Sequence, residues 1–158
     1  MDTTYLKSFA LGAVSGMRSL MAPVFTNEIL KSHHTRRLMH SPFKVLAEGK
    51  LSPFLKTAAL GELLVDKLPD IPDRIEPALL AGRAALGALS GAAFCAMENK
   101  HIAIGAATGA AGAIAAAYLF LFIRKKVGSE FKINDTVVGI AEDLMTIGSG
   151  LGLLKATK

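Results

Sequence analysis

One uncharged stretch limits what this chain can fold into. Residues 102–123 form 22 consecutive positions without a charged side chain. At about 1.5 Å rise per residue, an α-helix of this length spans the roughly 30 Å hydrocarbon core of a bilayer. The chain has 158 residues, of which 51% are hydrophobic, and this length suits one domain or one compact membrane unit. These features exclude a disordered chain and a disulfide scaffold, and they argue against an ordinary soluble enzyme.

The other apolar stretches predict an all-α fold, a polytopic transmembrane helical bundle with four to five membrane segments in a single domain over residues 1–158. The expected segments are 5–25, 53–67, 77–97, 102–123 and 135–154. Two Ser-Pro-Phe triplets predict helix starts at Pro42 and Pro53. The segment that begins at Pro53 is only about 22 Å long. It therefore either crosses the membrane, with tilt or with its ends extended by the interface, or re-enters and returns to the side from which it came.

Two of these segments align without gaps, which suggests an internal repeat. Residues 10–16 match residues 103–109 in their pattern of glycine and small apolar residues. Inverted two-helix repeats around a central helix would give the aligned segments opposite orientations, as in many transporters. Lysine and arginine counts are nearly equal on the two sides if five segments cross, and strongly unequal if segment 53–67 re-enters. We expect five crossings, with four as the alternative.

The glycines recur at a spacing that favours close helix packing. Small residues four apart let helix backbones approach each other in lipid, where helices gain nothing from excluding water. Glycine is also simply common in membrane helices. We expect these pairs to form helix contacts and a homo-oligomer, with a dimer favoured. The four pairs are Gly12 and Gly16, Gly87 and Gly91, Gly105 and Gly109, and Gly148 and Gly152.

Six charged residues lie within or beside the predicted segments. A charge inside hydrocarbon costs about 2.5–3.5 kcal/mol on insertion scales, so each of these residues needs a partner or water. They could line a polar path between helices, with Glu62 and Glu142 as titrating groups and the arginines as counter-ions. Alternatively they form a structural lattice that fixes helix register. The candidate residues are Arg18, Glu62, Asp66, Arg83, Glu142 and Asp143.

Other kinds of site have little support in the sequence. Net charge is +5, but the basic stretches lack the aromatic residues that stack on nucleic-acid bases, so we expect no nucleic-acid partner. Cys95 is the only cysteine, so no disulfide forms within the chain. No zinc, nucleophile-elbow or phosphate-loop motif is present, and His33, His34 and His40 suit a wet loop better than a metal site. We expect no enzyme activity, no cofactor and no metal.

Three stretches carry a resemblance to a known family. They are Gly12-x3-Gly16-x-Arg18, Glu62-x3-Asp66-Lys67-x-Pro69 and Gly82-Arg83-x3-Gly87-x3-Gly91. At these positions the chain resembles an uncharacterised family of bacterial integral membrane proteins, domain of unknown function 4126, and the similarity covers most of the chain. The resemblance implies a small multi-pass protein of the bacterial inner membrane, with the six charged residues as signature positions. It supplies no activity, and the basic stretch 31–50 lies outside its pattern.

The sequence therefore predicts a small integral membrane protein that interacts with the lipid bilayer. Our first hypothesis is a transporter or channel for a small solute or ion, with the intramembrane carboxylates and arginines along its path. The alternative is a non-transporting scaffold or lipid-interacting protein whose buried charges are structural. The sequence does not indicate the substrate, its direction of movement or a coupling ion.

Overall fold

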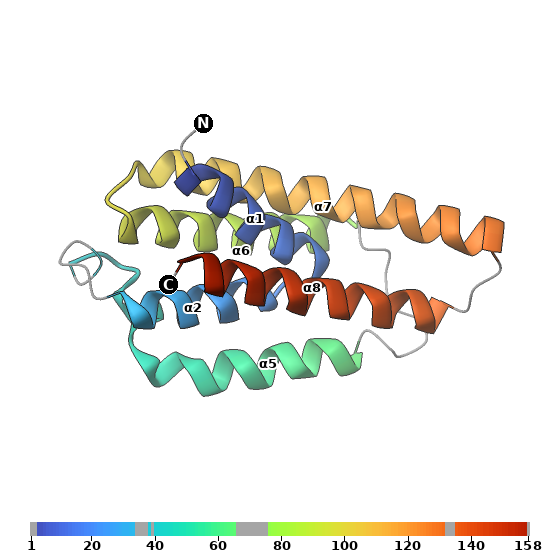
Figure 1. Ribbon diagram of the computed structural model, residues 1–158, viewed down its shortest axis with the longest axis horizontal. Helices are drawn as coiled ribbons and strands as arrows, with labels where there is room; N and C mark the ends of the chain where they lie inside the picture. Colours follow the sequence, from blue (N-terminus) through green and yellow to red (C-terminus); the bar gives the residue numbers. More distant parts are fainter. Residues whose placement is uncertain (1–2, 34–37, 39, 66–75, 132–134, 158) are drawn as a thin grey trace.

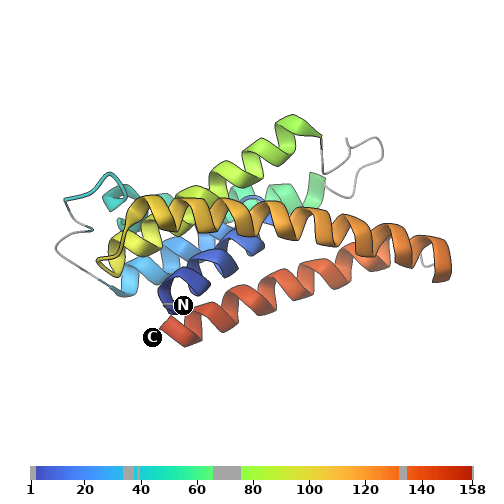
Figure 2. The ribbon, with the colours of Figure 1, turned by 90° about the horizontal axis from the view of Figure 1, so that it is seen from above.

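The protein is an elongated bundle of helices, seen along two directions in Figures 1 and 2. The computed structural model describes residues 3–33, 38, 40–65, 76–131 and 135–157, and every regular element in these ranges is helical. In chain order the elements are α1 (Thr3–Met17), α2 (Met21–Ser32), α4 (Lys44–Ala47), the 3-10 turn η1 (Gly49–Leu51), α5 (Ser52–Val65), α6 (Pro77–Met97), α7 (Ile102–Phe131) and α8 (Asp135–Thr157).

The first predicted segment is a helical hairpin and not one continuous helix. Helix α1 ends at Met17, and α2 begins at Met21 and runs back beside it (Figures 1 and 2). Met17 contacts Thr146 of α8, whereas Phe25 lies against Gly150, farther along α8. Phe25 follows Met17 in sequence, and Gly150 follows Thr146. Helices α2 and α8 therefore run in the same direction, and α1 runs against them. The prediction of a single helix over 5–25 was wrong.

Local chemistry explains where this segment folds back. Gly16 and Ser19 flank the turn, and both residues are weaker helix formers than the alanines and leucines around them. Pro23 lies in the first turn of α2. A proline is tolerated there because the first amides of a helix have no partner within the helix.

Three helices are long and apolar enough to cross a membrane, so the chain fits a membrane protein. The stretches are Pro77–Met97, Ile102–Val127 and Val137–Thr157. Large apolar side chains on their outer faces are exposed, among them Tyr118, Phe122 and Leu144. An apolar exposed face of this kind suits contact with lipid chains. The described structure does not establish the fourth and fifth crossings that the sequence predicted.

Glycines bring α1, α6 and α7 into close contact. A Cβ atom added to Gly12 would collide with the backbone of Gly109, and one added to Gly109 would collide with the backbone of Gly87. Gly91 and Gly105 meet in the same way, and Gly16 lies on Ala113. Three of the four predicted glycine pairs therefore pack within one chain. Gly148 and Gly152 have open space around them.

These contacts also fix the relative direction of the aligned segments. Gly12 lies on Gly109 and Gly16 on Ala113, so α1 and α7 run in the same direction (Figure 1). The inverted-repeat prediction requires opposite directions, and the described structure does not have them. The similarity between residues 10–16 and 103–109 reflects a shared need for small residues at one crossing.

Helix α5 lies at the edge of the bundle, where it packs mainly on α2 and η1. Its buried face is narrow and includes Leu55 and Ala59. At its first turns, Lys56 Nζ lies 2.8 Å from Glu28 Oε1 on α2, and the Ser52 hydroxyl donates to the same oxygen at 3.1 Å. The hydrogen bond from Lys56, helped by Ser52 and Lys31, lowers the pKa of Glu28 below its ordinary value, although burial opposes this.

The crowded glycines predict a position-dependent response to a single methyl group. Gly109→Ala should lower the free energy of unfolding by about 1–3 kcal/mol, because the added Cβ has only backbone to displace. Gly148→Ala is the matched control and should be neutral or stabilising by up to about 1 kcal/mol, since its site is open and alanine favours a helix. Reversible unfolding in mixed micelles measures both, and equal effects would contradict the packing described.

The Glu28 ion pairs predict a pH dependence with a definite sign. Because the pKa of Glu28 is lower in the folded chain, the pairs contribute fully above its unfolded pKa, and the contribution is lost as pH falls through the folded value. The difference in unfolding free energy between the natural chain and Glu28→Gln should be constant from about pH 7 to 5 and shrink below about pH 4. Lys56→Gln should show the same trend, and a difference that does not shrink would exclude this role.

Candidate functional site at the hairpin tip

The turn between α1 and α2 gathers four of the predicted charged residues, two of them buried and two half-buried. Residues 18–20 form this hairpin tip, and side chains from α5, α6 and α8 reach it. Neighbouring contacts place the tip near the middle of two candidate spans, because Gly16 meets Ala113 of α7 and Met17 meets Thr146 of α8. If these helices cross a membrane, the tip is non-helical backbone at mid-depth, which is tolerated only where protein or a wet cavity surrounds it.

Arg83 caps the end of α1. Its guanidinium Nη1 donates to the carbonyl of Gly16 at 3.0 Å, and the side chain is 5% exposed. In return, the Ser15 hydroxyl donates to the Arg83 carbonyl at 2.9 Å. The last carbonyls of a helix lack partners within the helix and carry a partial negative charge. A buried cation at this position satisfies one of them and matches the sign of the helix dipole.

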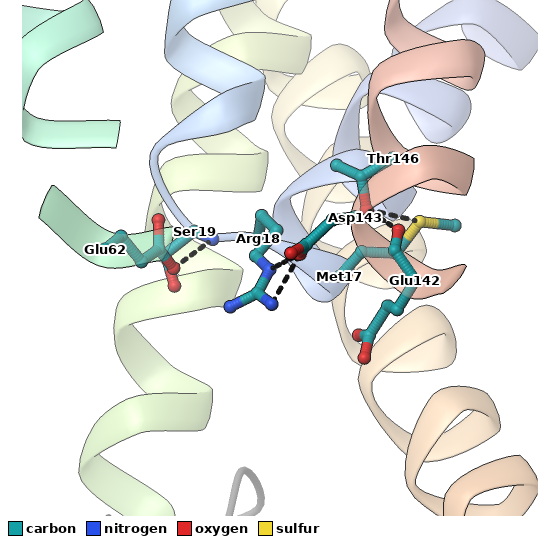
Figure 3. Close-up of polar contacts among 7 residues, drawn as sticks. All are labelled: Met17, Arg18, Ser19, Glu62, Glu142, Asp143 and Thr146. Carbon is teal, nitrogen blue, oxygen red and sulfur yellow. Dashed lines mark hydrogen bonds and ion pairs between the residues drawn. The ribbon is translucent and has the colours of Figure 1, made fainter. Parts of the chain in front are cut away.

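Glu62 caps the start of α2 with the opposite charge. The backbone amides of Ser19 and Leu20 donate to its two carboxylate oxygens, each at 2.8 Å (Figure 3 draws the contact with Ser19). The amides at a helix start lack partners within the helix and carry partial positive charge. Leu20, the N-cap residue, makes no side-chain capping hydrogen bond, and the Glu62 carboxylate from α5 instead holds the two backbone amides just before the first helical residue.

Arg18 at the tip pairs with Asp143 of α8. Its Nε donates to Asp143 Oδ1 at 2.7 Å, and Nη2 contacts the same oxygen (Figure 3). The Arg18 side chain is 3% exposed and that of Asp143 is 14% exposed. A charge-assisted bond in a setting this dry is strong, and the loss of either partner leaves a charge without compensation.

Glu142, the other predicted residue that the structure describes, does not make these contacts. Glu142 is buried, and its side chain extends away from the Arg18–Asp143 pair (Figure 3). Only one of two adjacent helical residues can face the tip, as the 100° step between them requires. Asp66 lies outside the described residues. The structure therefore brings Arg18, Glu62, Arg83 and Asp143 together around one turn.

Sequence reasoning missed the uncharged residues of the site. The Ser15 hydroxyl and the amides of Ser19 and Leu20 are partners of the charges. Thr146 is fully buried, and its hydroxyl donates to the Glu142 carbonyl at 2.7 Å and contacts Met17 Sδ at 3.4 Å. The cluster of glycine and serine around Arg18, followed by Pro23, was the signal that could have revealed the break in the helix.

The chemistry available at the tip is ionic and hydrogen-bonding. Across the described ranges, no group of three His, Cys, Asp or Glu side chains is placed to hold a metal ion. The site instead offers two helix ends of opposite dipole sign, contacted by Arg83 and Glu62, and beside them the Arg18–Asp143 ion pair. Such an arrangement can bind or release a small polar species by exchanging one of these internal contacts.

Comparison with known proteins gives no match, whether to a family model, to a curated protein or to a solved structure.

The Arg18–Asp143 contact predicts strong coupling between two residues. Arg18→Met or Asp143→Asn alone should lower the free energy of unfolding by roughly 3–5 kcal/mol, because a buried charge loses its partner. The double variant should lose clearly less than the sum of the two. The exposed pair Lys44–Glu48, 3.4 Å apart, provides the control cycle and should couple by less than about 1 kcal/mol. Additive losses at Arg18 and Asp143 would contradict the pairing.

Proposed function

We propose that this chain moves a small ion or solute across a membrane, with the hairpin tip as the polar part of its path. The observation that carries the proposal is a pair of helix ends level with the middle of two candidate spans, each contacted by an acidic or basic side chain from a different helix. Transporters use discontinuous helices in this way, and their half-helix ends contact substrates and coupling ions near the bilayer midplane.

We assign to Glu62 the step in which a side chain leaves the hairpin tip and opens the path. It belongs to α5, which packs on the bundle through α2 and η1 and leaves Phe54, Leu60 and Leu64 exposed. When Glu62 leaves the amides of Ser19 and Leu20, those donors become available to a passing ion or polar solute. Arg83 stays fixed by two hydrogen bonds to α1, and Arg18 with Asp143 links the tip to α8.

A second candidate function is a non-transporting scaffold or lipid-interacting protein. It is favoured by the fact that the contacts of Glu62, Arg83 and Asp143 described above are made to the hairpin itself. In that case the charges hold the hairpin in place and bind no substrate. Buried ionic groups of this kind can specify a single packing arrangement even where they add little stability.

The wider assignments rest on the sequence and its resemblance. We place the protein in the bacterial inner membrane as a multi-pass, non-enzymatic member of the family of unknown function 4126 that it resembles. The open positions of Gly148 and Gly152 on α8 are where a second copy would pack if the chain forms a homo-oligomer.

A flux measurement tests the transport proposal. The purified chain is reconstituted in vesicles that contain dyes sensitive to H⁺, Na⁺ or Cl⁻, and a gradient of each ion is applied in turn. The natural chain should dissipate at least one gradient, and Glu62→Gln should reduce that flux at least about tenfold because glutamine has no charge to exchange with a passing ion at the tip amides. Glu28→Gln is the matched control and should retain flux. Glu28 belongs to α2 and contacts the start of α5, away from the tip.

Folding must be measured on the same samples. Helix content and elution volume in detergent should be the same for the natural chain, Glu62→Gln and Glu28→Gln. No flux of any of the three ions above protein-free vesicles would contradict ion transport. A flux that Glu62→Gln leaves intact would remove Glu62 from the path, and unfolding of Glu62→Gln without any natural flux would support the scaffold.

A further inference from the structure

The two ends of the bundle differ strongly in positive charge. The end that carries both termini also contains the close of α2, the α4–η1 segment, the start of α5 and the turn between α6 and α7 (Figure 1). Seven lysines of the described residues lie there: Lys7, Lys31, Lys44, Lys50, Lys56, Lys100 and Lys155. At the opposite end the described residues contribute three: Arg124, Lys125 and Lys126.

Four of these lysines form one surface, which we call the lysine surface. It consists of Lys31, Lys44, Lys50 and Lys56, on α2, α4, η1 and α5. The acidic groups within it are Glu28, whose Oε1 lies 3.3 Å from Lys31 and 2.8 Å from Lys56, and Glu48, whose Oε1 lies 3.4 Å from Lys44. Four ammonium groups against two carboxylates leave a net positive surface.

Exposed apolar side chains lie beside these ammonium groups. Phe54, two residues before Lys56, is 70% exposed, and Val45, next to Lys44, is 53% exposed. Helix α5 continues this apolar face through Leu60 and Leu64. A helix of 14 residues is about 21 Å long, so it extends about two thirds of the way through a hydrocarbon layer of about 30 Å when its first turn lies at the edge of that layer. The lysine surface is then at headgroup level.

We infer that the lysine surface binds the headgroups of anionic phospholipids in the cytoplasmic leaflet. Its net positive charge complements phospholipids whose headgroup carries a phosphate but no cationic group. Phe54 and Val45 enter the hydrocarbon layer beneath these headgroups. Basic residues next to a membrane segment are attracted to anionic lipid in this way. The excess of lysine at this end also favours the cytoplasmic side by the positive-inside tendency. The inference is independent of whether the hairpin tip transports anything.

Lipid binding by the full chain in detergent tests the inference. The chain is titrated with phosphatidylglycerol and, separately, with phosphatidylcholine in mixed micelles, and binding is followed by native mass spectrometry. Phosphatidylglycerol should bind more tightly, and Lys44→Gln with Lys50→Gln should weaken it roughly tenfold. Lys125→Gln with Lys126→Gln at the opposite end is the matched control and should weaken it much less. Lys44→Arg with Lys50→Arg should retain binding, which separates charge from folding.

Three results would overturn the inference. They are equal binding of the two lipids, equal losses in the two glutamine double variants, or displacement of the lipid by free glycerol phosphate at similar concentration, which would indicate a soluble phosphate site. The leaflet is tested in intact bacterial cells with single cysteines in a Cys95→Ser background. A membrane-impermeant maleimide should label Lys125→Cys directly and Lys50→Cys only after lysis, and the reverse pattern would place the surface on the other side.

Discussion

The capping of two helix ends at the hairpin tip is the constraint on which the rest of the structure depends. A chain that reverses direction at membrane depth exposes carbonyls at the end of α1 and amides at the start of α2, where no water can reach them. Arg83 and Glu62 satisfy these groups with charges of the matching sign, at 3.0 and 2.8 Å. At these contacts the charged side chains and the backbone ends compensate each other.

The glycine contacts make this arrangement possible. Arg83 lies one turn before Gly87 on α6, and Gly87 rests on the backbone of Gly109. Gly12 of α1 rests on the same residue. Because α1 and α6 approach the same point on α7 so closely, the Arg83 guanidinium reaches the Gly16 carbonyl. Each glycine costs about 1 kcal/mol of helix propensity relative to alanine, and the close contacts that it permits offset this cost.

The sequence predicted the apolar helices well and the site in part. The helices over 77–97 and from 102 onward follow from long runs without charge, and the charged residues stood out because charge is costly in hydrocarbon. The reversal after Met17 was missed because a hydropathy pattern shows how long an apolar stretch is, and does not show whether the chain turns back within it. The caps were missed for a related reason. The partners of Glu62 are backbone amides, which every residue except proline has, so no side-chain pattern identifies them.

The position of α5 connects the stability of the tip with its proposed use. One end of α5 is held to α2 by Glu28 and its ion pairs, and the other end is held to the tip by Glu62. Between these two polar attachments the buried face is narrow and consists of small and medium side chains such as Ala59 and Leu55. In the arrangement that we propose, the start of α5 near Glu28 lies at the lysine surface, where water and headgroups compete for the same ions, and Glu62 lies within the apolar layer. The contact between Glu62 and the tip can therefore break while α5 stays attached to the bundle, because the ion pairs of Glu28 still hold its first turns. The amides of Ser19 and Leu20 then bind a different acceptor.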